Sequence, residues 1–213
     1  MGMDIKFNHC DITLNPSGSL YLHNMSALIL ADLHLGKGVQ LKDHGVPLID
    51  QLDQKTIQKF HADLTQYAPA LCVICGDLIH VSTPHLADQL RWFNNELTTY
   101  DTQFFLTLGN HDRYLFSDVL PLFRVVETYD LAGICCSHYP LNNGPNIAGH
   151  LHPGVKLKKG RITKVYKAFE VGEKHIVCPA YGHYTGAFSS ISDQHDYYLC
   201  YQNSVKKLRL SNL

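Results

Sequence analysis

The segment ALILADLHLGK, residues 27–37, joins an unbroken apolar run to the polar residues Asp32 and His34. An apolar run of this length is typical of a strand that is buried on both faces of a sheet. Three more short runs, at residues 70–75, 103–108 and 132–136, have the same character. Polar motifs follow such strands in the order GDLIH at 76–80, GNHDR at 109–113, SHYP at 137–140 and GHLHP at 149–153.

Two segments between these runs have apolar residues at close to helical spacing. The first set is Ile49, Leu52, Ile57, Phe60, Leu64 and Tyr67, and the second is Leu86, Leu90, Phe93 and Leu97. Thr83 followed by Pro84 is a start signal for the second helix. Strands that alternate with helices predict an α/β fold. From residue 155 onward the sequence instead has strand patterns joined by Gly-containing turns, and we expect this β-rich third to supply a second sheet.

The composition is that of a folded protein, and we expect one domain spanning residues 1–213. Hydrophobic residues make up 45% and charged residues 17% of the chain. The apolar runs fall far below the ~20 residues of a membrane span, and the first residues do not resemble a secretory signal. We therefore expect a soluble, cytoplasmic protein whose seven cysteines are reduced. Cys72 and Cys75 lie three apart on one expected strand and thus on opposite faces, which favours core packing over a shared metal.

The polar motifs carry imidazole, carboxylate and amide groups, which are metal ligands. In open α/β sheets the ligand site lies beyond the carboxyl ends of the strands, so we expect the five motifs to meet at one sheet edge. Asp32 and His34 are two residues apart, as are His150 and His152, and in extended backbone each pair points to one side. This donor mixture, without thiolate, suits Mn, Fe, Zn or Co better than Ca or Mg alone.

The ordered set D-x-H, G-D, G-N-H-D, H and G-H-x-H resembles the signature of the calcineurin-like metallophosphoesterase superfamily. ADLHLGK continuing into DHGVPL, GNHDR, GHLHPGVKLK and PAYGHYTGAF are most similar to its DNA-ligase-associated phosphoesterase group. The resemblance implies two stacked mixed β-sheets flanked by helices, and two divalent metal ions, of which we expect Mn first and Fe, Zn or Co as alternatives.

The resemblance also implies roles for individual residues. One ion would take Asp32, His34, Asp77 and His152, and the other would take Asp77, Asn110, His138 and His150. His111 would face the substrate and stabilise or protonate the leaving oxygen, and Asp112 would orient it. Lys37 and Arg113 are candidate phosphate contacts. His80 and His183 are weaker candidates for the edge of the site.

Charge is distributed unevenly along the chain. Residues 1–155 carry 8 Lys/Arg against 15 Asp/Glu, whereas residues 156–213 carry 10 against 4. Six basic residues and no acid lie between Lys156 and Lys167, either as a polyphosphate-binding surface or as a solvated hairpin. The leading hypothesis is a two-metal phosphodiesterase, such as a nuclease that acts on DNA beside a ligase and a helicase. The alternatives are a phosphomonoesterase or nucleotide pyrophosphohydrolase, and a non-catalytic scaffold of the same fold.

Overall fold

The computed structural model describes residues 1–37, 51–80, 84–114, 120–183, 185–189 and 191–208. Its first sheet has seven strands in chain order from β1 to β7. They are β1 (Met3–Phe7), β2 (Cys10–Leu14), β3 (Leu20–Leu22), β4 (Ala27–Leu30), β5 (Leu71–Cys75), β6 (Gln103–Thr107) and β7 (Phe123–Val126). β1 to β4 pair antiparallel, and β4 to β7 pair parallel. The parallel half therefore has its carboxyl ends at one edge.

The second sheet has eight strands in the order β15-β14-β12-β13-β10-β9-β8, with β11 paired to β12. They are β8 (Tyr129–Leu131), β9 (Ile134–Ser137), β10 (Asn146–Ala148), β11 (Gly154–Lys159), β12 (Ile162–Val171), β13 (His175–Val177), β14 (Asp196–Tyr201) and β15 (Ser204–Leu208). The neighbours β9, β10 and β13 run parallel, and the other pairs in this sheet are antiparallel. The predicted pair of stacked mixed sheets is confirmed.

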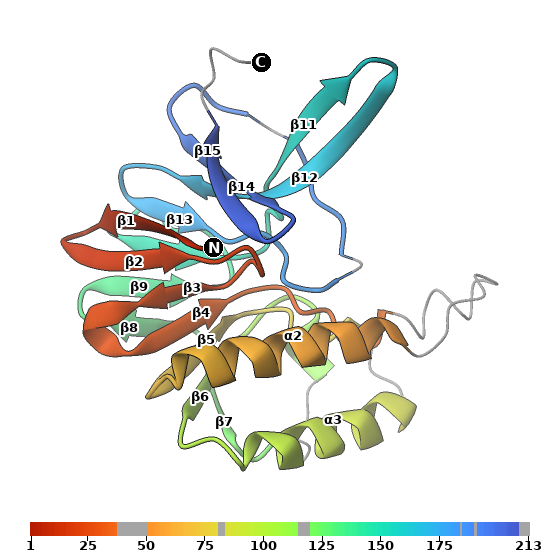
Figure 1. The fold of residues 1–213 in the computed structure, drawn as a ribbon. Coiled ribbons are helices and arrows are strands. Elements are labelled where there is room, and N and C mark those ends of the chain that lie inside the picture. Colours follow the sequence, from red (N-terminus) through yellow and green to blue (C-terminus); the bar gives the residue numbers. More distant parts are fainter. Residues whose placement is uncertain (38–50, 81–83, 115–119, 184, 190, 209–213) are drawn as a thin grey trace.

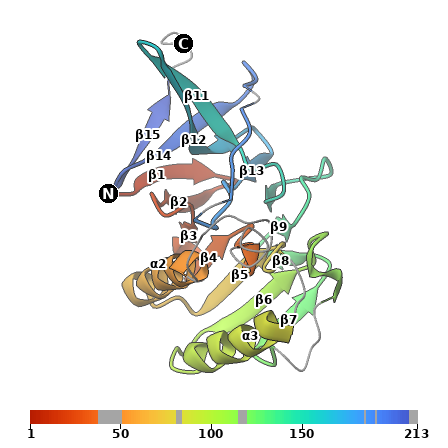
Figure 2. The same cartoon turned by 90° about the vertical axis from the view of Figure 1, so that its right-hand side faces the viewer.

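Two helices, α2 (Gln51–Tyr67) and α3 (Pro84–Leu97), cover the outer face of the first sheet. Figures 1 and 2 place them at the end of the molecule opposite to β12, β14 and β15. Short 3-10 turns, η1 (His23–Met25) and η2 (Asp112–Tyr114), complete the described elements. Of the two expected helix patterns, Ile49 and the Thr83 start signal lie outside the described residues.

The apolar runs are continuous because both faces of β4 and β5 are buried. Leu28 and Cys72 pack in the core under the helices, whereas Ile29 and Cys75 pack in the core between the sheets. Every second side chain thus enters a different core, and no polar face is left. Cys72 and Cys75 lie on opposite faces, as predicted, and all seven cysteines are free thiols.

The second sheet begins earlier in the chain than expected. β8, β9 and β10 precede residue 155 and belong to it, so the C-terminal third supplies part of the second sheet and the segment before it supplies the rest. The expected strand at 132–136 also shifts, because Ala132 and Gly133 both have positive φ, 53° and 85°, and form the tight turn between β8 and β9. In the described part of the chain, no helix is long and apolar enough to cross a bilayer.

Candidate metal centre

The predicted motifs follow strand ends in both sheets. Asp32, Asp77 and Asn110 follow the parallel strands β4, β5 and β6 of the first sheet, and His138 and His150 follow β9 and β10 of the second. The expectation of one sheet edge was therefore wrong, because the stacked sheets each contribute one edge. The two edges come together since Cys75 and Cys136 lie in the same core between the sheets.

The ligand-type side chains converge through left-handed backbone. Positive φ angles of 57°, 48°, 50°, 66° and 46° occur at Asp32, His34, Asp77, His150 and His152. The sequence suggested that each i, i+2 pair reaches the centre along extended backbone. The positive φ angles show that these pairs do not. A non-glycine residue in this region costs ~1–3 kcal/mol, and such strain clusters at functional sites. Backbone hydrogen bonds from Asp32 N to Gly76 O (3.0 Å) and from His34 N to Asp77 O (2.9 Å) hold the two loops together.

A first cluster consists of Asp32, His34 and His152. The Nε2 atoms of His34 and His152 lie 3.3 Å apart, and His152 Nε2 lies 3.3 Å from Asp32 Oδ1. Asp32 and His34 are buried, and the His152 side chain is 12% exposed. Three donor atoms therefore face one small volume.

A second cluster consists of Asp77, His138 and His150, and Asn110 joins it. His138 Nε2 lies 3.1 Å from His150 Nδ1, 3.1 Å from Asn110 Oδ1 and 3.6 Å from Asp77 Oδ1. On its other side, His138 Nδ1 contacts the carbonyl oxygen of Cys75 at 3.2 Å. A carbonyl accepts only from a protonated nitrogen, so this contact leaves the Nε2 lone pair directed at the cluster.

Asp77 lies between the two clusters. Its Oδ2 is 3.7 Å from His34 Nε2 in the first cluster, and its Oδ1 is 3.6 Å from His138 Nε2 in the second. Oδ1 also accepts the backbone N–H of His111 at 2.9 Å, which fixes the orientation of the carboxylate. Its two oxygens are thus shared between the clusters.

Glycines leave room for the side chains of the centre. A Cβ on Gly76 would overlap the His138 ring, and one on Gly109 would overlap the Asp77 carboxylate. A Cβ on Gly149 would come within 2.6 Å of Asp32 Oδ2. Each glycine therefore permits a close approach between a loop and a candidate ligand, and Gly76 in addition has a φ of +75°.

The donor set fits a divalent metal pair. Asp32 Oδ1 is buried and has no hydrogen-bond partner among the described residues, and a buried carboxylate oxygen without a partner is costly. Burial, with the charge of His152 and its neighbours, lowers the pKa of His34 to about 2. Burial likewise lowers the pKa of His150. These imidazoles are neutral at pH 7 and have the form that binds a metal.

His111 lies at the rim of the centre. Its Nδ1 is 2.9 Å from the carbonyl oxygen of His80, and its Nε2 is 4.0 Å from Asp77 Oδ2. The side chain is 34% exposed. The ring therefore reaches from solvent to the edge of the centre, with Nε2 directed inward.

The resemblance implied that Asp112 orients His111, but the Asp112 carboxylate does not contact the His111 ring. Its carboxylate accepts backbone N–H groups of Ile79 at 3.2 Å and Gly109 at 3.0 Å. It is 1% exposed, and burial raises its pKa to about 6. Asp112 therefore ties together the loops after β5 and β6, and the His80 carbonyl contacts His111 instead.

His80 is closer to the centre than its sequence position indicated. Its ring stacks on His111 at a centroid distance of 4.8 Å, and its Nδ1 lies 3.2 Å from His34 Nδ1. Tyr139, which the sequence did not single out, packs on His150 at 4.4 Å and is 44% exposed. The one sequence signal for Tyr139 is that it is an aromatic residue next to the candidate ligand His138, since such residues often shape the pocket around a ligand.

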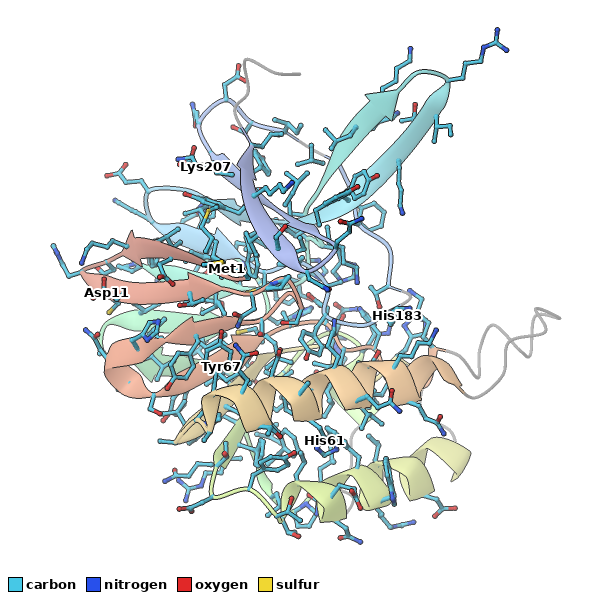
Figure 3. The ribbon with its side chains drawn as sticks, viewed as in Figure 1. Met1, Asp11, His61, Tyr67, His183 and Lys207 are labelled. Carbon is cyan, nitrogen blue, oxygen red and sulfur yellow. The ribbon has the colours of Figure 1, made fainter. Side chains whose placement is uncertain are left out.

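The expected phosphate contacts lie in different environments. Arg113 is exposed in η2, directly after Asp112. Lys37 is half-buried, and burial lowers its pKa. His183 lies beside α2, where its backbone N–H donates to Thr56 Oγ1 at 3.0 Å, and Figure 3 shows it near the N-terminal half of that helix.

Two half-buried lysines support the loop that carries Tyr181 and Gly182. Lys59 donates to the carbonyl of Tyr181 at 2.6 Å, and Lys167 donates to those of Ala180 and Gly182 at 2.6 and 2.5 Å. This loop in turn donates from Gly182 N to Asp32 O at 2.9 Å. Lys167 therefore does not belong to the exposed basic surface that the sequence suggested.

Two neighbouring clusters of ligand-type side chains thus lie where the edges of the stacked sheets meet. The chain belongs to the calcineurin-like phosphoesterase family, whose model matches residues 25–205, and this family has a dinuclear divalent metal centre. The chain is thus a metal-dependent phosphoester hydrolase. A crystal structure of Pseudomonas putida nuclease MPE has a similar fold, with a TM-score of 0.82 and 22% identity, covering 98% of this chain and 100% of the other. No curated protein matches the sequence.

Proposed function

We propose that residues 1–213 act as one metallophosphoesterase domain that hydrolyses phosphodiester bonds. The position of Asp77 carries this proposal. Its Oδ2 faces His34 at 3.7 Å and its Oδ1 faces His138 at 3.6 Å, so that one carboxylate serves two neighbouring ligand sets. A site of this kind binds two cations close enough to hold one phosphoryl group.

The proposed division of the ligands follows the family resemblance. One ion would be held by Asp32, His34, Asp77 and His152, and the other would be held by Asp77, Asn110, His138 and His150. When bound, the pair supplies Lewis acidity and an activated water for attack on phosphorus. Manganese is our first choice, with iron, zinc or cobalt as alternatives, because imidazole and carboxylate together suit these ions.

His111 is the proposed acid or charge-stabilising group. Since Nδ1 contacts the His80 carbonyl at 2.9 Å, Nδ1 carries a proton and Nε2 is free to bind or donate a proton at the leaving oxygen. Asp112 acts through the backbone, because it holds the loop that carries Asn110 and His111. Arg113 and Lys37 are proposed to contact phosphate from outside the metal ligands.

Two features beside the centre support a nucleic-acid substrate. Tyr139 is 44% exposed and Phe188 is 67% exposed, and they pack on His150 and His152 respectively. Exposed aromatic rings beside a phosphate site provide faces on which bases stack. Hydrolysis of a small phosphomonoester does not need aromatic faces on which bases can stack.

The β11–β12 hairpin extends from the ligand His152 and projects from the body in Figure 1. Lys156 and Lys158 are exposed and two residues apart, so they lie on one face of the hairpin. Lys164 pairs with Leu157 on the other face. A single strand that follows the first face would therefore contact Lys156 and Lys158, and only part of the basic segment.

The resemblance to the DNA-ligase-associated group supports a narrower proposal, a DNA-repair nuclease that works with a ligase and a helicase. The nuclease MPE of Pseudomonas putida is described as a nuclease, and its overall fold is shared. This context rests on likeness of sequence and fold and is carried by no single contact.

A substrate panel tests the proposed reaction. The protein, stripped with chelator and reloaded with Mn²⁺, should hydrolyse an aryl phosphodiester and single-stranded DNA faster than an aryl phosphomonoester or a nucleoside diphosphate. EDTA should abolish every activity. A clear preference for the monoester or the nucleoside diphosphate would replace this proposal with a small-molecule phosphatase.

A charge-matched pair of variants tests the hairpin. Replacing Lys156 and Lys158 with Gln should weaken DNA binding and flatten its salt dependence by a log–log slope of about 0.7–0.9 per lost contact. The control replaces the exposed Lys174 and Lys206 with Gln, which removes the same charge elsewhere. Hydrolysis of the aryl phosphodiester should be unchanged in both. Equal DNA binding by the two variants would show that the hairpin is only a solvated surface.

A further inference from the structure

A second group of metal-ligand side chains lies outside the candidate centre. Glu170 is near the end of β12, His175 is the first residue of β13, and His195 directly precedes β14. β12 pairs with both other strands, and Glu170 lies opposite Val177 on one side and Tyr197 on the other. The sheet register therefore brings three segments to one point.

The donor atoms of this group converge on one carboxylate oxygen. Glu170 Oε1 lies 2.8 Å from His195 Nδ1 and 3.6 Å from His175 Nε2. The two imidazole rings meet edge to face at a centroid distance of 4.7 Å. All three donors lie within 4.8 Å of one another, and tetrahedral zinc with bonds near 2.0–2.1 Å sets its ligands roughly 3.3 Å apart.

The surroundings are shaped for this convergence. His195 Nδ1 is buried and makes no hydrogen bond of acceptable geometry within the described residues, although Glu170 is adjacent. At Gly172 a Cβ would come within 3.0 Å of His175 Nε2 and 3.1 Å of His195 Cδ2. A larger residue there would press on both rings, so glycine leaves the space that they occupy in the observed arrangement.

The Glu170 carboxylate contacts a neighbouring side chain, and the group of three residues borders a cavity. Glu170 is 8% exposed and interacts with the Tyr197 hydroxyl, which accepts the N–H of Ser192 at 3.0 Å. His195 also lines a cavity of about 510 Å³, whose charged residues are Glu173, Asp193, Asp196 and Lys6. Asp196 is paired with Lys207 at 2.6 Å. The cavity leaves room for a water ligand, and the carboxylates in its lining outnumber the ammonium groups.

The group is separate from the candidate metal centre. His175 pairs with Asn146 at the start of the parallel strand β10, whereas His150 follows the end of that strand. The two sites thus lie beyond opposite ends of β10, and this inference does not depend on the proposed reaction.

We propose that Glu170, His175 and His195 form a third metal site, which binds one zinc-type divalent ion. Two imidazoles and one carboxylate are a common zinc set, and they suit Ca²⁺ or Mg²⁺ poorly. The bound ion links the turn before β13 and the segment before β14 to the central strand β12. Its fourth position faces the cavity.

Metal counting tests the proposal. Chelator-stripped protein is loaded with Co²⁺, passed through a desalting column and analysed for bound metal. The variant His195→Asn should hold about one ion per chain fewer than the parent. The control His61→Asn alters a histidine on α2 that contacts Tyr100 at 2.9 Å and belongs to neither group (Figure 3), and it should match the parent.

A second variant guards against simple loss of folding. His195→Cys replaces an imidazole with a thiolate and should retain the ion. Its Co²⁺ form should gain a thiolate-to-cobalt charge-transfer band that the parent and His61→Asn lack. Equal metal content in the parent and His195→Asn, or the absence of this band in a folded His195→Cys, overturns the proposal. If the dinuclear centre binds no ions, the metal content of the parent and of His195→Asn falls by the same amount, and the difference between them is unchanged. Failure of the proposed function can therefore be distinguished from failure of the third metal site.

Discussion

Replacing Gly76 with alanine should damage the metal centre through the His138 ring. A Cβ at residue 76 overlaps that ring, and it would displace His138 Nδ1 from the Cys75 carbonyl, now 3.2 Å away. Loss of such a partner behind a metal ligand typically costs 10–100-fold in metal affinity. We therefore expect Mn²⁺ binding by Gly76→Ala to weaken by about 10–100-fold.

The same substitution should also lower the free energy of unfolding, and this loss has two parts with different causes. Alanine at a φ of +75° costs ~1–2 kcal/mol, and overlap with a packed ring costs ~1–3 kcal/mol. Gly133→Ala is a matched control, because Gly133 has a φ of +85° with nothing within 4 Å of the added Cβ. It should lose only the first part.

Urea unfolding of the metal-free variants and Mn²⁺ titration calorimetry provide the two readouts. Gly133→Ala should bind Mn²⁺ as tightly as the parent while losing ~1–2 kcal/mol of unfolding free energy. Gly76→Ala should lose more in both measurements. If the two variants bind Mn²⁺ equally well, the space beside Gly76 is not what allows the His138 ring to bind metal.

Further predictions concern His111, Asp77 and Lys59. His111→Asn should keep both ions yet lower kcat by ~10²–10⁴-fold, with a smaller loss for good leaving groups; an equal loss for good and poor leaving groups would argue against an acid role. Asp77→Ala should hold well under one ion per chain at the dinuclear centre by elemental analysis, since both ligand sets lose a carboxylate oxygen, and retention of both ions there would show that it is no bridge. Burial, followed by the charge of Lys167, lowers the pKa of Lys59 to about 7, so the unfolded chain binds more protons above that pH. Lys59 should therefore make the unfolding free energy of metal-free protein rise with pH from about pH 7, by at most about 1.4 kcal/mol per pH unit. Burial also lowers the pKa of Lys167 to about 8, so Lys59→Met should flatten the rise between pH 7 and 8 and leave the part due to Lys167 above pH 8. The exposed control Lys55→Met should keep the whole rise, and an unchanged slope between pH 7 and 8 in Lys59→Met would contradict the assignment.

The sequence predicted the buried strands β4, β5 and β6 and the polar motifs that follow them well, for a physical reason. Strands buried between two layers contain no polar residue, so Asp32 and Asp77 stand out where β4 and β5 end. It could not predict which sheet each strand joins. β9 looks like β4 and β5 in sequence, yet it pairs with β8 and β10, and β10 pairs with β13, which comes later in the chain.

Long-range pairing also explains what the sequence failed to indicate. Lys167 reads as one of six basic residues on a hairpin, but its strand continues into the core, and its ammonium group donates to carbonyls after β13. Glu170, His175 and His195 form no motif, because strand register alone brings them together. Left-handed backbone at Asp32 likewise has no signature in its residue type.

Anomalous diffraction from crystals loaded with Mn²⁺ tests the central claim most directly. Two strong peaks are expected, one on either side of the Asp77 carboxylate. One should be surrounded by Asp32, His34 and His152, and the other by Asn110, His138 and His150. A single peak at this centre, or two peaks that do not share Asp77, would contradict the dinuclear site on which the proposed phosphodiesterase rests.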